Sequence, residues 1–235
     1  MLPKPDEDID AKKYDESKKE VGGFGGTLHK INPQIKIAHE GEVNRARVMP
    51  QNSFFVATKS PSSTVFVFDY SKHRSFPTDN VCRPQHKLLG HTLEGYGLSW
   101  SPHDTGHILS GSNDNLICLW DITEAGLEVN PRDTRNYHTS VVEDVDWHKM
   151  YPTFFGSVGD DSKLIVWDTR RDAPVHEVTK AHESDVNCIS FNPFNEFLLA
   201  TGGLDSVVAL WDLRNMKEPI HKLKWHEKVC TYVHI

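Results

Sequence analysis

The sequence of 235 residues has few of the features that mark enzymes, membrane proteins or disulfide-rich secreted proteins. Its four cysteines, Cys82, Cys118, Cys188 and Cys230, are irregularly spaced, which argues against a disulfide framework and favours reduced thiols. No apolar run approaches membrane-spanning length and no signal peptide opens the chain, so we expect a soluble intracellular protein. No P-loop, dinucleotide fingerprint or nucleophile elbow is present, so the sequence predicts neither catalytic residues nor a cofactor.

Positive charge is in the minority. The chain has 26 Lys and Arg against 33 Asp and Glu, for a net charge of −7 with neutral histidines. This balance argues against direct binding of nucleic acid and permits basic partners. We therefore expect protein partners with basic segments, and neither a nucleic acid nor a membrane.

What the sequence does contain is an internal repeat. Four times, a histidine is followed thirty residues later by an aspartate that closes an aromatic–Asp dipeptide. The pairs are His39 and Asp69, His91 and Asp121, His138 and Asp168, and His182 and Asp212. A fixed interior with connections of variable length is typical of a WD-repeat β-propeller, in which each unit forms one four-stranded blade.

We predict an all-β fold: a WD-repeat β-propeller with four complete blades and flanking single strands. Residues 1–27 are expected to be a polar, flexible lead, and residues 28–235 the propeller, with one strand at 31–37 and the start of a further blade at 226–235. The four blades are expected at about 38–90, 91–137, 138–181 and 182–225. Because such propellers most often close with seven blades, we expect a partial ring and a chain truncated at both ends.

Four residue types recur at fixed positions and predict a buried hydrogen-bond relay in each blade. A Trp indole can donate to a Ser or Thr hydroxyl, the hydroxyl to one histidine nitrogen, and the other nitrogen to a turn aspartate. The complete sets are His91, Ser110, Asp114 and Trp120; His138, Ser157, Asp161 and Trp167; and His182, Thr201, Asp205 and Trp211. The first unit has Ser62 and Phe68 in place of the Asp and the Trp, so we expect a weaker tether there.

The relay also accounts for residues that could suggest a metal site. The chain has 14 histidines, and five of them recur once per unit. This spacing places the five around a ring, whereas a zinc ion needs three or four ligands converging at about 2 Å. The neighbouring carboxylates of Asp160 and Asp161 are explained by a turn and a relay position. We therefore predict no metal site.

Several stretches are more specific than the repeat itself. Residues 39–47 and 49–52, 94–100, 141–145 and 195–202 resemble the retinoblastoma-associated histone-binding WD-repeat proteins, the family of the small subunit of chromatin assembly factor. The resemblance covers nearly the whole chain. It implies a nuclear, non-catalytic adaptor that holds core histones for complexes that assemble, deacetylate, remodel or methylate chromatin, with subunits of those complexes as further partners.

The resemblance also implies a binding site. In this family, acidic and amide side chains on one face, near the mouth of the channel, bind an unmodified histone tail or a partner's basic peptide. The residues at the matching positions are Glu42, Asn44, Glu94, Tyr96, Glu143, Asp160, Asp185 and Asn187. The repeat agrees with this assignment, because all but Asp160 stand three or five residues after a relay histidine, where a loop enters an inner strand. Asp160 lies in a turn that should open on the same face.

The family's second site is not carried over. It holds a histone helix between an N-terminal helix and a loop of the last blade, and the matching region of this chain begins after that helix and ends before that blade. Residues 228–235 also depart from the family's fifth unit.

Two other functions are compatible with the repeats. Residues 167–170 and 211–214 fit the Trp-Asp-x-Arg pattern of WD-repeat substrate receptors of cullin-type ubiquitin ligases, for which a ligase adaptor would be the partner. A generic protein-interaction scaffold is the other. No residue of the sequence supports a third possibility, an enzyme built on a propeller.

Overall fold

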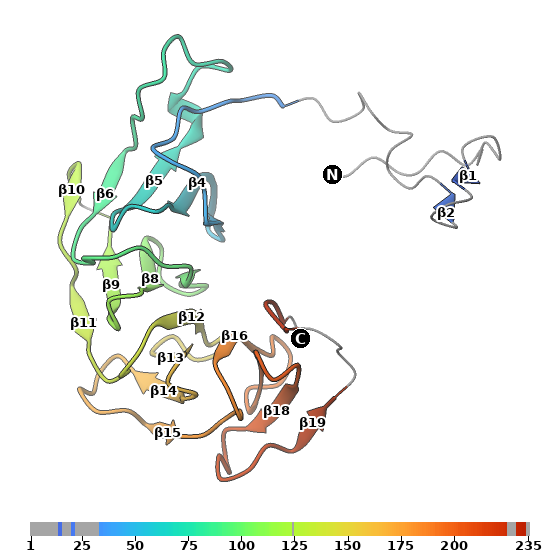
Figure 1. Ribbon diagram of the computed structural model, residues 1–235. Helices are drawn as coiled ribbons and strands as arrows, with labels where there is room; N and C mark the ends of the chain where they lie inside the picture. Colours follow the sequence, from blue (N-terminus) through green and yellow to red (C-terminus); the bar gives the residue numbers. More distant parts are fainter. Residues whose placement is uncertain (1–13, 16–19, 22–32, 124, 225–228, 234–235) are drawn as a thin grey trace.

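The computed structural model describes residues 14–15, 20–21, 33–123, 125–224 and 229–233. The described residues form β-strands and irregular connections, with one 3-10 turn, η3 (Tyr70–Lys72), and no α-helix. Four sheets follow one another along the chain in an arc (Figure 1). This arrangement confirms the predicted all-β fold class of propeller blades.

Each of these four sheets is built on the strands of one repeat unit, and we call them blades 1 to 4. Blade 1 consists of β3 (Arg45–Met49), β4 (Asn52–Lys59), β5 (Val65–Asp69), β6 (His86–Leu88) and the added strand β10 (Glu128–Val129). Blade 2 consists of β7 (Leu98–Trp100), β8 (His107–Gly111), β9 (Ile117–Asp121) and β11 (Asp133–Arg135). Blade 3 consists of β12 (Val142–Trp147), β13 (Phe154–Gly159), β14 (Leu164–Asp168) and β15 (His176–Val178). Blade 4 consists of β16 (Val186–Phe191), β17 (Leu198–Gly203), β18 (Val208–Asp212) and β19 (His221–Leu223).

Neighbouring strands within each blade are antiparallel, with one exception that the sequence did not predict. β10 belongs by sequence to the second unit, but it pairs in parallel with β6, the outer strand of blade 1. The chain thereby covers an edge that would otherwise present unpaired backbone groups.

The core lies between blades, because alternate residues of a strand point to opposite faces of a sheet. In β14, Leu164 and Val166 pack with residues of blade 4, whereas Ile165 and Trp167 pack with residues of blade 2. All four are fully buried. Each blade is therefore stabilised mainly by its neighbours along the arc.

The segments that flank the blades differ from the prediction. Residues 33–37, the described part of the expected strand at 31–37, form no strand, and the backbone N–H of Lys36 donates to the carbonyl of Ser75. A single backbone hydrogen bond holds the segment, but a strand requires a series of such bonds to a neighbouring strand. Within the expected flexible lead, β1 (Tyr14–Asp15) and β2 (Glu20–Val21) pair antiparallel, and the rest of the lead lies outside the described residues.

Residues 229–233 also form no strand, yet they lie where the next inner strand would begin. The N–H of Cys230 donates to the carbonyl of Gly203 over 3.2 Å, as the N–H of Val142 donates to Ser112 over 3.0 Å. The two donors are equivalent, since each stands four residues after the histidine of its unit. Ile235 lies outside the described residues.

The relay is complete in blade 3. The indole of Trp167 donates to Ser157 Oγ over 2.9 Å, Ser157 Oγ lies 2.8 Å from His138 Nε2, and His138 Nδ1 lies 3.0 Å from both carboxylate oxygens of Asp161. Because the ionised carboxylate of Asp161 can only accept, Nδ1–H donates to it, and Nε2 then accepts from the Ser157 hydroxyl. Every polar atom of this chain of contacts is thereby partnered.

Blade 4 repeats this geometry. Trp211 donates to Thr201 Oγ1 over 2.9 Å, and His182 lies 2.8 Å from Thr201 and 3.0 Å from Asp205. In both blades the aspartate also accepts from the backbone N–H that follows the histidine and from the N–H two residues beyond itself. The intervening residue adopts positive φ, as Ser162 does at 60° and Ser206 at 62°.

Blade 1 has lost part of the relay, at the two positions where its sequence differs. His39 still contacts Thr58 Oγ1 at 2.8 Å, but its other nitrogen lies 3.2 Å from the carbonyl of Gly41. The rings of Phe66 and Phe68 pack against the imidazole instead of an indole that could donate.

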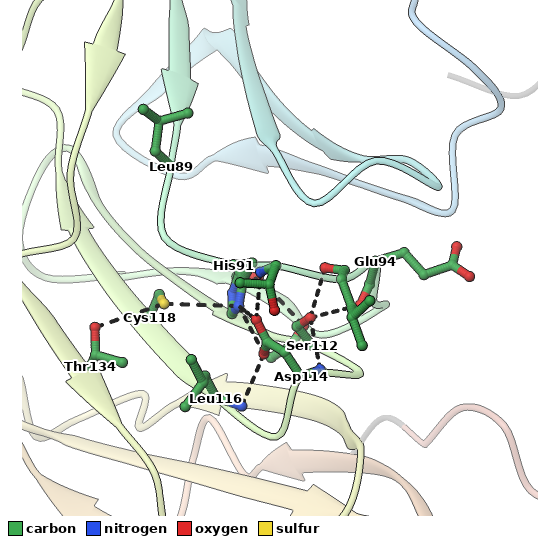
Figure 2. Close-up of polar contacts among 12 residues, drawn as sticks. Leu89, His91, Glu94, Ser112, Asp114, Leu116, Cys118 and Thr134 are labelled. Atoms are coloured by element: carbon green, nitrogen blue, oxygen red, sulfur yellow. Dashed lines mark hydrogen bonds and ion pairs between the residues drawn. The ribbon is translucent and has the colours of Figure 1, made fainter.

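In blade 2 the prediction for Trp120 is wrong. His91 contacts Asp114 and Ser110 as expected, at 3.1 Å each, and Figure 2 shows His91 beside Asp114. The Trp120 indole, however, donates to the carbonyl of Leu89 over 2.9 Å.

The place of Trp120 at Ser110 is taken by Lys59, which comes from blade 1. Its Nζ donates to Ser110 Oγ over 2.7 Å and to the carbonyl of Gly111 over 2.6 Å, and the side chain has no exposed surface. Burial lowers the pKa of Lys59 from its ordinary 10.5 to about 7, although the carboxylate of Asp114 opposes this shift. Lys59 therefore connects blade 1 to blade 2 through a buried amine.

The relay in blade 3 can be tested with two neighbouring carboxylates. Asp161→Ala should lower the free energy of unfolding by roughly 1–3 kcal/mol, because it leaves His138 Nδ1 without its acceptor. Asp160→Ala removes no relay partner and is the matched control. It should change the free energy of unfolding by less than about 0.5 kcal/mol. Burial opposes ionisation of Asp161, but the hydrogen bond from His138 outweighs it and lowers the pKa of Asp161, so the stabilisation is present above the unfolded pKa and is lost as the pH falls. Equal shifts of the urea midpoint in the two variants would contradict the relay.

Lys59→Met should raise the free energy of unfolding by roughly 1–2 kcal/mol below pH 7, since the charge penalty exceeds the two hydrogen bonds that Nζ makes. The pKa of Lys59 is lower in the folded than in the unfolded protein, so unfolding takes up a proton between about pH 7 and 10.5 and the penalty shrinks over that range. Urea denaturation at several pH values should show the gain declining as the pH rises. The exposed Lys72→Met is the control, and a gain that does not depend on pH would contradict this explanation.

Candidate functional site

The eight residues expected to bind a partner lie at the same end of the inner strands, and we call them the channel mouth. Asn44 directly precedes β3, Tyr96 precedes β7, Glu143 is the second residue of β12, and Asp185 directly precedes β16. The other members are Glu42 before β3, Glu94 before β7, Asp160 directly after β13, and Asn187 within β16. The mouth therefore takes residues from all four blades.

The relay turn positions Glu94, one of the two mouth residues of blade 2. The N–H of Thr92 donates to Asp114 over 2.8 Å, and Ser112 Oγ donates to the carbonyl of Glu94 over 2.7 Å. Figure 2 shows that the carboxylate of Glu94 extends away from these contacts, while its backbone lies beside Ser112. The same turn that satisfies the buried histidine thus fixes the loop from which Glu94 projects.

A glycine allows this close approach. A Cβ on Gly95 would lie 2.6 Å from the carbonyl oxygen of Gly111 and 3.0 Å from Lys59 Nζ. Any side chain at position 95 would therefore push the Glu94 loop away from blade 2.

Blades 1 and 2 are joined at the mouth by a direct contact. Asn44 Nδ2 donates to Glu94 Oε2 over 3.3 Å, and both side chains are half-buried. The amide and the carboxylate therefore form one continuous polar surface across the blade boundary.

Three mouth carboxylates from blades 3 and 4 influence one another. Burial, and then the carboxylates of Asp160 and the neighbouring Asp144, raise the pKa of Glu143 to about 7. Burial and the charge of Asp185 raise the pKa of Asp160 as well. Glu143, Asp160 and Asp185 thus form an acidic cluster in which the negative charges disfavour one another, and a cation placed among them would relieve the repulsion.

Asp144 lies beneath this cluster and was not predicted. Its carboxylate is buried, accepts from the N–H of Ile189 over 3.2 Å and lies 3.8 Å from Arg45. Burial raises the pKa of Asp144 to about 6. Asp144 stands six residues after His138, whereas the sequence pattern selected only residues three or five positions after a relay histidine.

The remaining mouth residues are less closely connected. In the part of the chain that the structure describes, Glu42, Tyr96 and Asn187 make no hydrogen bond to another mouth residue. Tyr96 presents 42% of its surface to solvent, so its ring is accessible to a partner.

The described residues contain no group of three or more His, Cys, Asp or Glu side chains that could hold a metal ion. None of the elements described is a helix with the length and apolar character needed to cross a membrane.

The repeats correspond to a known family. The family model with the description "WD domain, G-beta repeat" matches residues 82–121, 130–168 and 173–212, slightly more than half of the chain. Each match ends on the closing aspartate of blade 2, 3 or 4. Blade 1, which lacks the Trp and the Asp of the relay, is not matched.

The acidic cluster can be tested without a ligand. Asp160→Asn should lower the pKa of Glu143 from about 7 towards its ordinary value, because it removes the neighbouring charge that contributes most after burial. Carboxyl-carbon NMR titration measures this pKa directly. Glu128→Gln on β10 is the control, and a pKa of Glu143 that is the same in all three proteins would show that the carboxylates do not interact.

Proposed function

This chain belongs to the WD-repeat family, and on that basis we propose that it is a non-catalytic adaptor that binds an unmodified, basic histone tail at the channel mouth. Repeats of this family indicate a protein-interaction scaffold. The stretches that resemble the retinoblastoma-associated histone-binding proteins support core histones as the partner. They also support action in the nucleus, within complexes that assemble or modify chromatin.

The observation that carries the proposal is the acidic cluster of Glu143, Asp160 and Asp185. Burial and mutual repulsion hold the pKa of Glu143 near 7, so these carboxylates are poorly compensated by the protein itself. A lysine or arginine side chain would supply the missing positive charge. This requirement favours a basic partner over a neutral or acidic one.

The distribution of the mouth residues favours an extended peptide. Glu42, Glu94, Glu143 and Asp185 come from four consecutive blades, so they follow the curve of the arc. Arginine can engage a carboxylate through two hydrogen bonds, and such charge-assisted bonds are the stronger kind. Loss of one such partner costs roughly 1.5–3 kcal/mol, which is about tenfold or more in affinity.

A second candidate function rests on the Trp-Asp-x-Arg positions. Arg170 binds Asp168 through Nε and Nη2, and Arg214 binds Asp212 in the same way. The two hydrogen bonds hold each guanidinium group in a fixed orientation. The side chains of Arg170 and Arg214 are 69% and 65% exposed, so both are accessible to a partner. This geometry suits a ligase adaptor. Recovery of such an adaptor from a nuclear extract, without histones, would favour it.

The main proposal is tested by titrating the protein with an unmodified histone-tail peptide and measuring binding by calorimetry or fluorescence anisotropy. Glu94→Gln combined with Glu143→Gln should weaken binding at least about tenfold, because it removes carboxylates from two blades. Glu128→Gln combined with Glu218→Gln removes the same charge from exposed positions outside the mouth and should leave the affinity within about twofold after screening by salt.

Circular dichroism should first establish that both double variants are folded. Equal affinity of the two for the peptide would show that the site is assigned wrongly. Absence of any binding by the folded wild-type chain would contradict the proposed function.

A further inference from the structure

Two cysteines from separate segments meet on blade 4. Cys188 lies on β16, and Cys230 lies in the segment 229–233, whose N–H at Cys230 donates to the carbonyl of Gly203. Cys188 Sγ lies 3.8 Å from the carbonyl oxygen of Cys230. Both thiols are free and buried.

The sulfur atoms converge on one glycine. A Cβ on Gly202 would lie 2.6 Å from Cys230 Sγ and 2.8 Å from Cys188 Sγ, closer than real Cβ contacts allow. Two atoms this close to a common point lie within a few ångströms of each other, and a disulfide requires the sulfurs to approach to about 2 Å. The glycine leaves room for both sulfurs.

We propose that Cys188 and Cys230 form a reversible disulfide that fastens the segment 229–233 to blade 4. The oxidant would be a peroxide. The thiolate of Cys230 attacks a peroxide oxygen, which gives a sulfenic acid and releases hydroxide. The thiolate of Cys188 then attacks that sulfur and displaces a second hydroxide. In sum, two thiols lose two protons and two electrons, and hydrogen peroxide is reduced to two molecules of water.

The order of attack follows from burial. Cys230 is 6% exposed and belongs to a short segment, whereas Cys188 is 1% exposed within an inner strand. Burial, and then the proximity of Cys230, raise the pKa of the Cys188 thiol, which slows its reaction at neutral pH. The disulfide should therefore form slowly, and faster as the pH rises.

The cross-link would change the stability of one blade. It would close a loop that contains β17, β18 and β19, which restricts the unfolded chain more than the folded one. It would also hold 229–233 in the place of a following inner strand. The midpoint of thermal unfolding should rise by several degrees on oxidation.

Cys118 provides a matched control. It is also buried, but its sulfur contacts His91 and Thr134 at 3.9 Å and no second thiol. Cys82 is half-exposed and lies in a loop, so it reports on oxidation at the surface.

The test treats the full chain with hydrogen peroxide, alkylates the remaining thiols and maps disulfides by mass spectrometry. We expect an intramolecular link between Cys188 and Cys230, a loss of two hydrogens from the intact mass, and full reversal by dithiothreitol. Thermal unfolding should shift upward in the oxidised wild type and in Cys118→Ser, but not in Cys188→Ser or Cys230→Ser.

The mapping uses the wild-type protein, so the outcome does not depend on whether the serine variants fold. Both thiols remaining alkylatable after peroxide treatment at mildly alkaline pH would overturn the proposal. So would disulfides that involve only Cys82 or join two chains.

Discussion

A buried imidazole must have both of its nitrogens partnered, and this requirement organises the protein. In blades 2, 3 and 4 the histidine contacts a hydroxyl nineteen residues later and a carboxylate twenty-three residues later. A buried polar group without a hydrogen-bond partner costs roughly 1–3 kcal/mol. The two spacings are therefore the same in blades 2, 3 and 4, whereas the connections between units vary in length. The same aspartates accept from the backbone of the entry loops, so the relay also fixes the loops that carry the mouth residues. Stability and binding surface thus share one set of contacts.

Lys59 shows how much the relay can adapt. The position ten residues before the closing aspartate holds glycine or valine in blades 2 to 4, but a lysine in blade 1. Its ammonium group needs buried acceptors and takes Ser110 and Gly111, which turns the Trp120 indole to Leu89. The histidine and the aspartate of blade 2 keep their partners. The tryptophan is therefore a replaceable member of the relay, whereas the contact between the histidine and the hydroxyl is present in all four blades.

The repeat was sufficient to predict the four blades, most of the relay and the common face of the mouth, because each follows from spacing within a unit. What it could not predict depends on contacts between units. Lys59 donates a hydrogen bond to Ser110 in the next blade, and β10 pairs with β6 of the previous blade. Asp144 packs against β16 and accepts a hydrogen bond from the backbone of that strand. The segment 33–37 alternates like a strand, yet it forms no ladder in the described structure, since periodicity alone does not supply a pairing partner.

The central claim is that a single basic peptide follows the mouth across consecutive blades. NMR mapping of the isotopically labelled chain, during titration with an unmodified histone-tail peptide, tests it most directly. We expect saturable shift changes at Asn44, Glu94, Glu143 and Asp185, which come from four blades. Saturable changes confined to one blade, or to the surroundings of Arg170 and Arg214, would contradict it.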